Sequence, residues 1–271
     1  MRRLSLDHLT IIDATPLELI DAAAAGGFDA VGLRIVTPLA AKPAAEVIGQ
    51  PQMLRDLKAR TAATGVSIGL IESIWLSPET DPASLEPALA TGAELGARFA
   101  LVAGNDPDES RLTDNLGRLA RIAESCGTEI AFEFMPFTKI RSLDDGLRIS
   151  RAVGRPNVRL LIDALHVSRS GADMRALPKF DASVVGYVHL CDAPATQPPP
   201  EGLRDEARFA RLMPGEGELA LDAFLGAMPA NAPIGLEAPC RAYAHLPPVE
   251  YGKLAGSITR DWLRRYDNSR P

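Results

Sequence analysis

Cysteine is scarce in this chain and shows none of the spacings that mark a structural site. The 271 residues include three cysteines, at positions 126, 191 and 240. They form neither a disulfide framework nor the closely spaced pair of a zinc site. The sequence therefore predicts a protein of a reducing compartment, most simply the cytoplasm.

Long apolar runs, basic charge and aromatic residues are also lacking. No stretch reaches the roughly 18 consecutive apolar residues of a transmembrane helix, so no membrane partner is expected. The net charge of -6 argues against nucleic acid, because binding to it depends on neutralising phosphates. Aromatic residues make up only 5% of the chain, too few for a surface on which bases stack. We therefore expect a small-molecule substrate.

What the chain does contain is a regular alternation of short apolar runs and amphipathic stretches. The runs predict strands near residues 3–9, 30–35, 66–71, 99–102, 130–134, 159–162, 184–190 and 234–236. The stretches between them predict helices near residues 16–25, 51–64, 85–95, 112–125, 143–153, 173–177, 219–228 and 248–264. Eight strand–helix repeats predict a parallel sheet, and eight is the number that closes a (β/α)8 TIM barrel.

The residues between these elements agree with an α/β barrel. Thr15 and Pro16 suit the start of a helix, and Gly65, Gly96 and Gly127 each stand where a helix ends. An open, doubly wound sheet would favour a glycine-rich loop after the first strand, but residues 9–14 contain no glycine. We expect residues 1–271 to form a single TIM barrel domain. The proline-rich segment 193–200 opens a long stretch to about residue 214, which we interpret as a loop on the catalytic rim rather than a linker.

Four consecutive predicted strands end in a residue of metal-binding type. Strands five to eight end in Glu133, Asp163, His189 and Glu237. Active sites of TIM barrels lie at this end of the strands, so these side chains are expected at matching height. Each alone is also typical of a helix cap or an ion pair, but three acids together would repel one another unless a cation lay among them. Oxygen and imidazole donors without thiolate suit Mn²⁺, Mg²⁺ or Co²⁺, and tolerate Zn²⁺.

Further motifs accompany this quartet. They are the run at 17–34, the sequence Asp-Ala-Leu-His at 163–166 and the sequence Pro-Gly-Glu-Gly-Glu at 214–218. With them the chain resembles, over nearly its whole length, the sugar phosphate isomerase/epimerase family, the xylose-isomerase-like TIM barrels. The resemblance implies one divalent metal, commonly Mn²⁺, held by the four ligands Glu133, Asp163, His189 and Glu237.

The resemblance also implies a chemistry. In the epimerases of this family one ligand glutamate removes a proton alpha to a carbonyl and the other returns it, which gives these roles to Glu133 and Glu237. Relatives include dehydratases that act on inosose or 3-dehydroshikimate. The endonuclease branch is disfavoured, because it uses several zinc ions and the chain has only four histidines. Homo-oligomers are common among relatives, and the sequence leaves the oligomeric state open.

Other polar residues are candidates for the substrate pocket. His166 follows Asp163 by three residues, and it either acts on a substrate oxygen as a general acid or orients Asp163. An ion pair between Arg34 and Glu72 is an alternative to substrate binding by either. Arg204, Arg208 and Arg211 could close, with Asp192, over an anionic substrate, but such a charge run is more often a solvated helix face. The predicted substrate contacts are His8, Arg34, Glu72, Trp75, Arg204, Glu216 and Arg241.

The sequence thus predicts a metal-dependent barrel enzyme that abstracts a proton alpha to a carbonyl. Isomerisation or epimerisation of a keto-sugar or related polyol is the leading hypothesis. A lyase that dehydrates an inosose-like or 3-dehydroshikimate-like substrate is the alternative. A barrel that serves as a non-catalytic binding subunit is the third hypothesis, against which the intact quartet argues.

Overall fold

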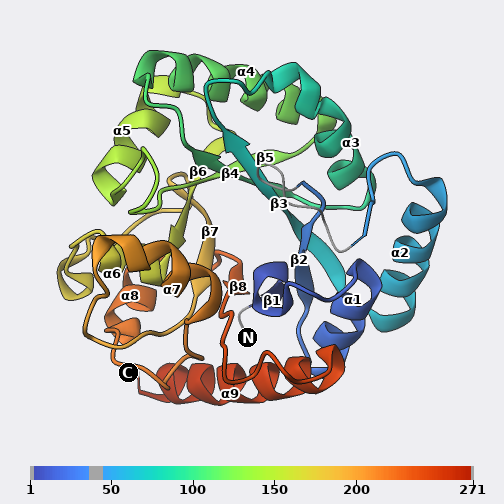
Figure 1. The fold of residues 1–271 in the computed structure, drawn as a ribbon, viewed down its shortest axis with the longest axis vertical. Coiled ribbons are helices and arrows are strands. Elements are labelled where there is room, and N and C mark those ends of the chain that lie inside the picture. Colours follow the sequence, from blue (N-terminus) through green and yellow to red (C-terminus); the bar gives the residue numbers. More distant parts are fainter. Residues whose placement is uncertain (1–2, 37–44, 270–271) are drawn as a thin grey trace.

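The computed structural model describes residues 3–36 and 45–269 and shows the barrel that the sequence predicts. Eight parallel strands pair in chain order, and the last pairs with the first to close the ring (Figure 1). The strands are β1 (Leu4–Asp7), β2 (Ala30–Arg34), β3 (Ser67–Leu76), β4 (Phe99–Gly104), β5 (Glu129–Glu133), β6 (Val158–Asp163), β7 (Val185–Leu190) and β8 (Ile234–Leu236).

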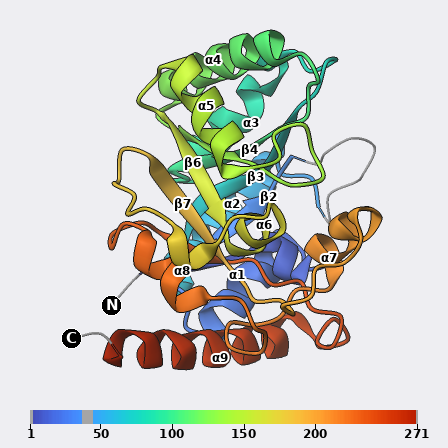
Figure 2. The same ribbon diagram turned by 90° about the vertical axis from the view of Figure 1, so that its left-hand side faces the viewer.

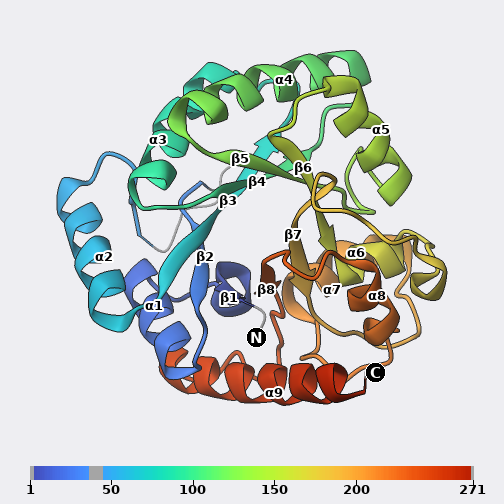
Figure 3. The same ribbon diagram turned by 180° about the vertical axis from the view of Figure 1, so that it is seen from behind.

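Helices surround this ring on the outside, as the views from both ends show (Figures 1 and 3). They are α1 (Pro16–Ala25), α2 (Pro51–Thr64), α3 (Glu86–Glu94), α4 (Glu109–Cys126), α5 (Leu143–Val153), α6 (Ala164–Arg169), α7 (Leu203–Phe209), α8 (Leu221–Ala227) and α9 (Pro248–Asn268). The predicted cap at Thr15 is confirmed, because its side chain and that of Glu18 form a capping box. Within the described residues, no helix is long and apolar enough to cross a membrane.

Two sets of apolar residues form the core. The larger set lies between the strands and the helices. The smaller consists only of strand residues, namely Leu70, Phe99, Leu101, Ala131, Leu161 and Tyr187, and it fills the barrel interior. Side chains alternate along a strand, so the residue two positions after each interior residue also points inward. This places Glu133, Asp163 and His189 directly above Ala131, Leu161 and Tyr187.

Two strands end elsewhere than the apolar runs predict. β3 continues to Leu76, past a register shift between Ile71 and Ile74, so Glu72 and Trp75 lie within the strand and not after it. A buried acid interrupts the apolar pattern without ending the strand, because Glu72 finds polar partners inside the barrel. β1 is shorter than predicted and ends at Asp7, and His8 begins a 3₁₀ turn (His8–Ile11).

The helix predicted at 173–177 is wrong. Residues Met174–Ala176 form a single 3₁₀ turn, and the helix α6 begins directly after β6. It can begin there because the Asp163 carboxylate accepts a hydrogen bond from the backbone N–H of His166, at 3.0 Å, and so caps the helix. The segment 193–214 is not loop throughout, since it contains a 3₁₀ turn (Pro200–Gly202) and α7. Figure 2 places α7 at the end of the barrel toward which the strands run.

The first prediction concerns the contact of α1 with α9, which lie side by side (Figure 1). A Cβ atom on Gly252 would lie 2.2 Å from the carbonyl oxygen of Ala22, a backbone atom that cannot move aside. We expect Gly252→Ala to destabilise the fold by about 1–3 kcal/mol, as overpacking does. Gly117→Ala in α4 is the control, because its Cβ would meet nothing nearer than 3.9 Å, and it should raise stability. Urea denaturation measures both, and an unchanged midpoint for Gly252→Ala would contradict the packing.

Candidate metal centre

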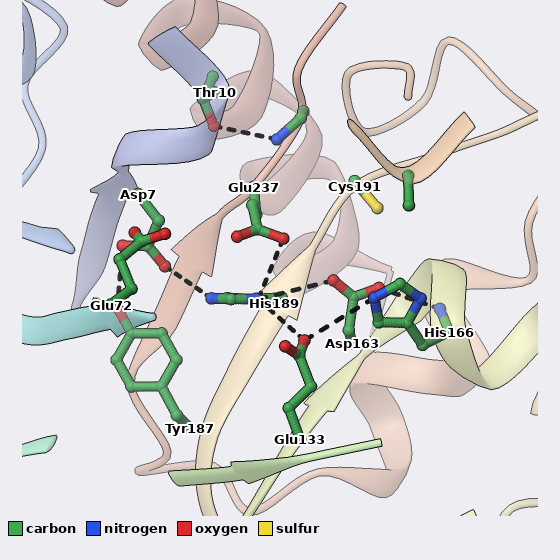
Figure 4. Close-up of polar contacts among 12 residues, drawn as sticks. Asp7, Thr10, Glu72, Glu133, Asp163, His166, Tyr187, His189, Cys191 and Glu237 are labelled. Atoms are coloured by element: carbon green, nitrogen blue, oxygen red, sulfur yellow. Dashed lines mark hydrogen bonds and ion pairs between the residues drawn. The ribbon is translucent and has the colours of Figure 1, made fainter. Parts of the chain in front are cut away.

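The four predicted ligands meet inside the barrel mouth. Each offers one donor atom, and these atoms lie within 4.8 Å of one another (Figure 4). Nδ1 of His189 is 3.5 Å from Oε1 of Glu133, 3.6 Å from Oδ2 of Asp163 and 3.5 Å from Oε2 of Glu237. Two donors that share one ion at about 2.1 Å lie at comparable separations. The four residues predicted from their positions at strand ends therefore lie together in the structure.

The charges of these side chains also suit a cation. Oε1 of Glu133 and Nδ1 of His189 are buried without a hydrogen-bond partner among the described residues, a costly state that an ion would relieve. Burial, together with the charges of Glu237 and Asp163, raises the pKa of Glu133 to about 7. Against the effect of burial, Glu237 and the neighbouring carboxylates raise the pKa of His189 well above its ordinary value. The residues thus fit a divalent ion, which would replace the proton that His189 otherwise holds.

Asp7, which was not predicted from the sequence, contacts the second ring nitrogen of His189. Its Oδ2 lies 3.0 Å from Nε2 of His189, and its Oδ1 accepts hydrogen bonds from Ser5 at 2.6 Å and Tyr187 at 3.2 Å. Glycines on the two neighbouring strands make room for it, since a Cβ on Gly235 would lie 1.8 Å from Oδ2. A carboxylate on the second ring nitrogen keeps Nδ1 turned toward a metal.

The second prediction follows from this contact. We expect Asp7→Asn to weaken Mn²⁺ binding about 10- to 100-fold, the usual cost of losing such a partner. The amide keeps the size of the side chain and an acceptor for Ser5, but it lacks the charge that favours the N–H of His189. Isothermal titration with Mn²⁺ measures the affinity. Asp114→Asn, an exposed position on α4, is the matched control, and an Asp7 variant with the same affinity as this control would refute the role.

Arg211 is the second functional residue that sequence reasoning missed as a member of the site. Its guanidinium is 1% exposed and donates from Nη1 to Oδ2 of Asp163 at 2.6 Å, while Nη2 lies 2.8 Å from Oε2 of Glu237. Although burial opposes it, this cation holds the pKa of Asp163 well below its usual range. Three carboxylates and one divalent ion leave one negative charge, which Arg211 cancels. The interpretation of 211 as part of a solvated helix face is therefore wrong.

His166 lies at the edge of the centre, on α6. Its Nε2 is 4.0 Å from Oε1 of Glu133, and its ring packs edge-on against Phe137. Burial, aided by the charge of Arg211, lowers the pKa of His166 to about 4. The imidazole is therefore neutral at pH 7 and can both donate and accept a hydrogen bond. Its backbone N–H donates to Oδ1 of Asp163 at 3.0 Å, so His166 helps to orient that carboxylate. Action of its ring on a substrate oxygen stays a prediction.

The predicted contacts from β2, from β3 and from the turn after β1 form a cluster of their own. Glu72 accepts the backbone N–H of His8 at 3.0 Å and pairs with Arg34 at 3.2 Å. Nδ1 of His8 accepts the backbone N–H of Arg34, and its Nε2 lies 2.8 Å from the carbonyl of Ala14. Both ring nitrogens of His8 are thus occupied, which does not favour a role in substrate binding. Burial, then Glu237 and Asp7, raise the pKa of Glu72 to about 7.

The remaining predicted contacts lie on the rim. Trp75 is half-buried in β3, and Arg204 is exposed on α7. Arg241 is exposed and pairs with Asp205. Glu216 accepts hydrogen bonds from the backbone of Met213 and the hydroxyl of Tyr243, so it shapes its turn. Contact of these residues with a substrate stays a prediction.

Comparison with known proteins agrees with the barrel fold. A family model described as "Xylose isomerase-like TIM barrel" matches residues 20–265. The chain belongs to this family. The resemblance on which the sequence prediction rested is thereby confirmed.

The sequence identity to individual known proteins is low. An inosose isomerase of Bacillus velezensis is 35% identical over 116 residues, which are 42% of this chain and 39% of that protein. The chain thus spans about two fifths of the length of the curated relatives it matches. The IOLI protein, solved with a bound zinc atom, has a TM-score of 0.79 at 21% identity over 97% of this chain and 99% of that one. The probable 3-DHS dehydratase AsbF of Bacillus anthracis has a TM-score of 0.70 at 14% identity over all of both chains.

Proposed function

We propose that this protein is a divalent-metal-dependent isomerase or epimerase that abstracts a proton alpha to the carbonyl of a keto-sugar or related polyol. The observation that carries the proposal is the buried quartet, in which two glutamates from separate strands, β5 and β8, share one centre with Asp163 and His189. The likeness to inosose isomerase over 116 residues supports an isomerase.

The four ligands would hold one divalent ion, for which we propose Mn²⁺, with Mg²⁺, Co²⁺ and Zn²⁺ as alternatives. When bound, the ion supplies Lewis-acid polarisation of the carbonyl and stabilises the enediolate. The zinc atom in the IOLI protein supports a divalent ion without deciding which one.

The residues of the chain supply the proton transfers. One carboxylate, of Glu133 or Glu237, accepts the proton as the C–H bond next to the carbonyl breaks and its electron pair moves into the enediolate. The other glutamate, which begins the reaction as a carboxylic acid, delivers its proton to the opposite side of the same carbon, which inverts it. Delivery to the neighbouring carbon, together with transfer of the hydroxyl proton from the first oxygen to the second, moves the carbonyl. Neutral His166, whose Nε2 lies 4.0 Å from Oε1 of Glu133, would donate a hydrogen bond to a substrate oxygen at this end of the site. Arg211 offsets the negative charge of Asp163 and Glu237.

A dehydratase is the second candidate. It would begin with the same proton abstraction and then expel a hydroxyl from the next carbon, which leaves as water after it takes up a proton. Two guanidinium groups favour it, because Arg34, which pairs with Glu72, and the exposed Arg204 suit a substrate that carries a carboxylate.

Proton exchange tests the proposal. Protein freed of metal and reloaded with Mn²⁺ is incubated in D₂O with ketoses, inososes and 3-dehydroshikimate, and NMR follows the carbon next to the carbonyl. The proposal expects metal-dependent entry of deuterium there, and the carbon skeleton of the product distinguishes an isomerase from a dehydratase. A protein that binds no divalent ion, or that forms product without deuterium at that carbon, would overturn the proposal. The first of these outcomes would favour a non-catalytic barrel.

A further inference from the structure

A buried ion pair joins α6 to α7 beside the metal centre. Arg169, the last residue of α6, donates from Nε to Oε2 of Glu206 at 2.9 Å and from Nη2 to Oε1 at 2.7 Å. Its Nη2 also donates to the carbonyl oxygen of Pro194 at 2.8 Å. The two side chains are only 3% and 9% exposed. Such a two-pronged, buried pair fixes the distance and the angle between its two helices.

This ion pair is connected to the metal ligands through α7. Glu206 is followed by Ala207, whose carbonyl oxygen accepts a hydrogen bond from Nε of Arg211 at 2.7 Å. The remaining nitrogens of Arg211 face Asp163 and Glu237. The position of Ala207, and therefore of α7, decides where this guanidinium points.

The contacts then return to their starting point. Asp163 caps α6 through the N–H of His166, and α6 ends in Arg169. The sequence of contacts from Asp163 through α6 to Arg169, across to Glu206, and through Ala207 to Arg211 and back to Asp163 is a closed ring. Its two side-chain bridges are both buried ion pairs, one at the metal ligand and one at the opposite end of the same short helix.

We propose that Arg169 and Glu206 are positioning residues that act through Arg211: they hold α7 where the carbonyl of Ala207 directs the guanidinium of Arg211 toward Asp163 and Glu237. The exposed ion pairs on the outer helices have no such connection, and the pair of Lys58 with Glu94 is an example. The inference concerns the same four residues as the proposed function. It rests on the part of that function in which these residues bind a divalent ion, and not on the reaction that follows.

The test is a double-mutant cycle on Mn²⁺ affinity, measured by calorimetry. Arg211→Met removes a positive charge next to the ligands and should strengthen Mn²⁺ binding about tenfold or more. Glu206→Gln should shift the affinity in the same direction by about threefold or more, because a loosened α7 lets the guanidinium leave its carboxylates. In the Arg211→Met background the Glu206 substitution should have no further effect on Mn²⁺ affinity. Glu94→Gln, which breaks the exposed helix pair, is the matched control and should leave the affinity unchanged.

Two results would overturn the inference. One is a change in Mn²⁺ affinity on Glu206→Gln that is equal with and without Arg211. The other is a Mn²⁺ affinity that Glu206→Gln changes in neither background. Either result would mean that the pair of Arg169 and Glu206 has a purely structural role. Its loss would then lower the melting temperature of the metal-free and the Mn²⁺-loaded protein alike. Where Glu206→Gln does not fold, Arg169→Lys enters the same cycle, because it keeps the charge and loses the two-pronged geometry. The titration needs no substrate, so absence of deuterium exchange in the wild type would refute the proposed function and leave this result intact.

Discussion

We expect Glu237→Gln to slow solvent-deuterium exchange about 1,000-fold, and Glu133→Gln to slow it by a similar factor. Loss of a general base slows a reaction by a factor of this size. It is the largest effect we expect. The amide keeps the shape of the side chain and an oxygen for the ion, but it cannot accept a proton from carbon. Both carboxylates are buried, at 3% and 4% exposure, so no water or surface acid can substitute for them at the reacting carbon.

The two variants should differ in one respect. If one glutamate serves each side of the reacting carbon, each variant loses exchange chiefly with one of the two epimers offered as starting material. NMR in D₂O with each epimer separately measures this, with Mn²⁺ in excess so that loss of metal does not imitate loss of the base. Glu94→Gln on the surface of α3 controls for the substitution itself. Equal exchange in the Glu237 variant and in this control with both epimers would exclude the two-base mechanism.

The barrel and the four ligands could be predicted because both follow from local pattern. Apolar runs separated by amphipathic stretches define the strands, and the functional polar residues of a TIM barrel lie at the carboxyl ends of those strands. Glu133, Asp163 and His189 each close such a run, so the sequence places them at one height. Closure of the sheet then brings them together without any further information.

Asp7 and Arg211 were missed for different physical reasons. Asp7 interrupts an apolar run on β1, which is the same signal that identified the quartet, and it could have been found by that rule. Arg211 lies on no strand and reaches the ligands from the segment after α7, across a distance in sequence that no local pattern encodes. The helix α6 was missed because its cap, Asp163, was already assigned as a predicted metal ligand. In the structure the Asp163 carboxylate caps α6 and also faces the other three predicted ligands.

The second large effect we expect is stabilisation of the fold by added Mn²⁺, and it should grow with pH. Ligand at a thousandfold excess over Kd stabilises a protein by about 4 kcal/mol. For a chain of this size each kcal/mol raises the melting temperature by about 2–4 °C, so Mn²⁺ should raise it by about 10 °C near pH 8. Calorimetric melting with Mn²⁺ and with a chelator measures the difference, which should be clearly smaller near pH 6.5.

The sign of this pH dependence comes from the groups at the centre. The pKa of Glu133 rises from 4.5 to about 7, and that of Glu72 does the same, both first through burial. A carboxyl whose pKa is raised on folding contributes stability below its unfolded value, and that contribution is lost as the pH rises through its folded value. The raised pKa of His189 acts in the same direction. The metal-free fold should therefore melt at a lower temperature near pH 8 than near pH 6.5.

Mn²⁺ reverses this loss because it takes the place of the protons. Near pH 6.5 Mn²⁺ must displace protons from both Glu133 and His189. Near pH 8 Glu133 is already ionised, so the ion binds its carboxylate without displacing a proton. The other buried histidines act in the opposite direction, because burial lowers the pKa of His8 and of His166 from 6.5 to about 4 and the unfolded chain then binds their protons more tightly. Their effect cancels in the metal-induced shift, which compares melting with and without the ion at the same pH. His189→Gln is the control variant, since it removes the ligand with the most strongly bound proton. A metal-induced shift that is equal at both pH values in the wild type would mean that the ion does not bind at these four residues.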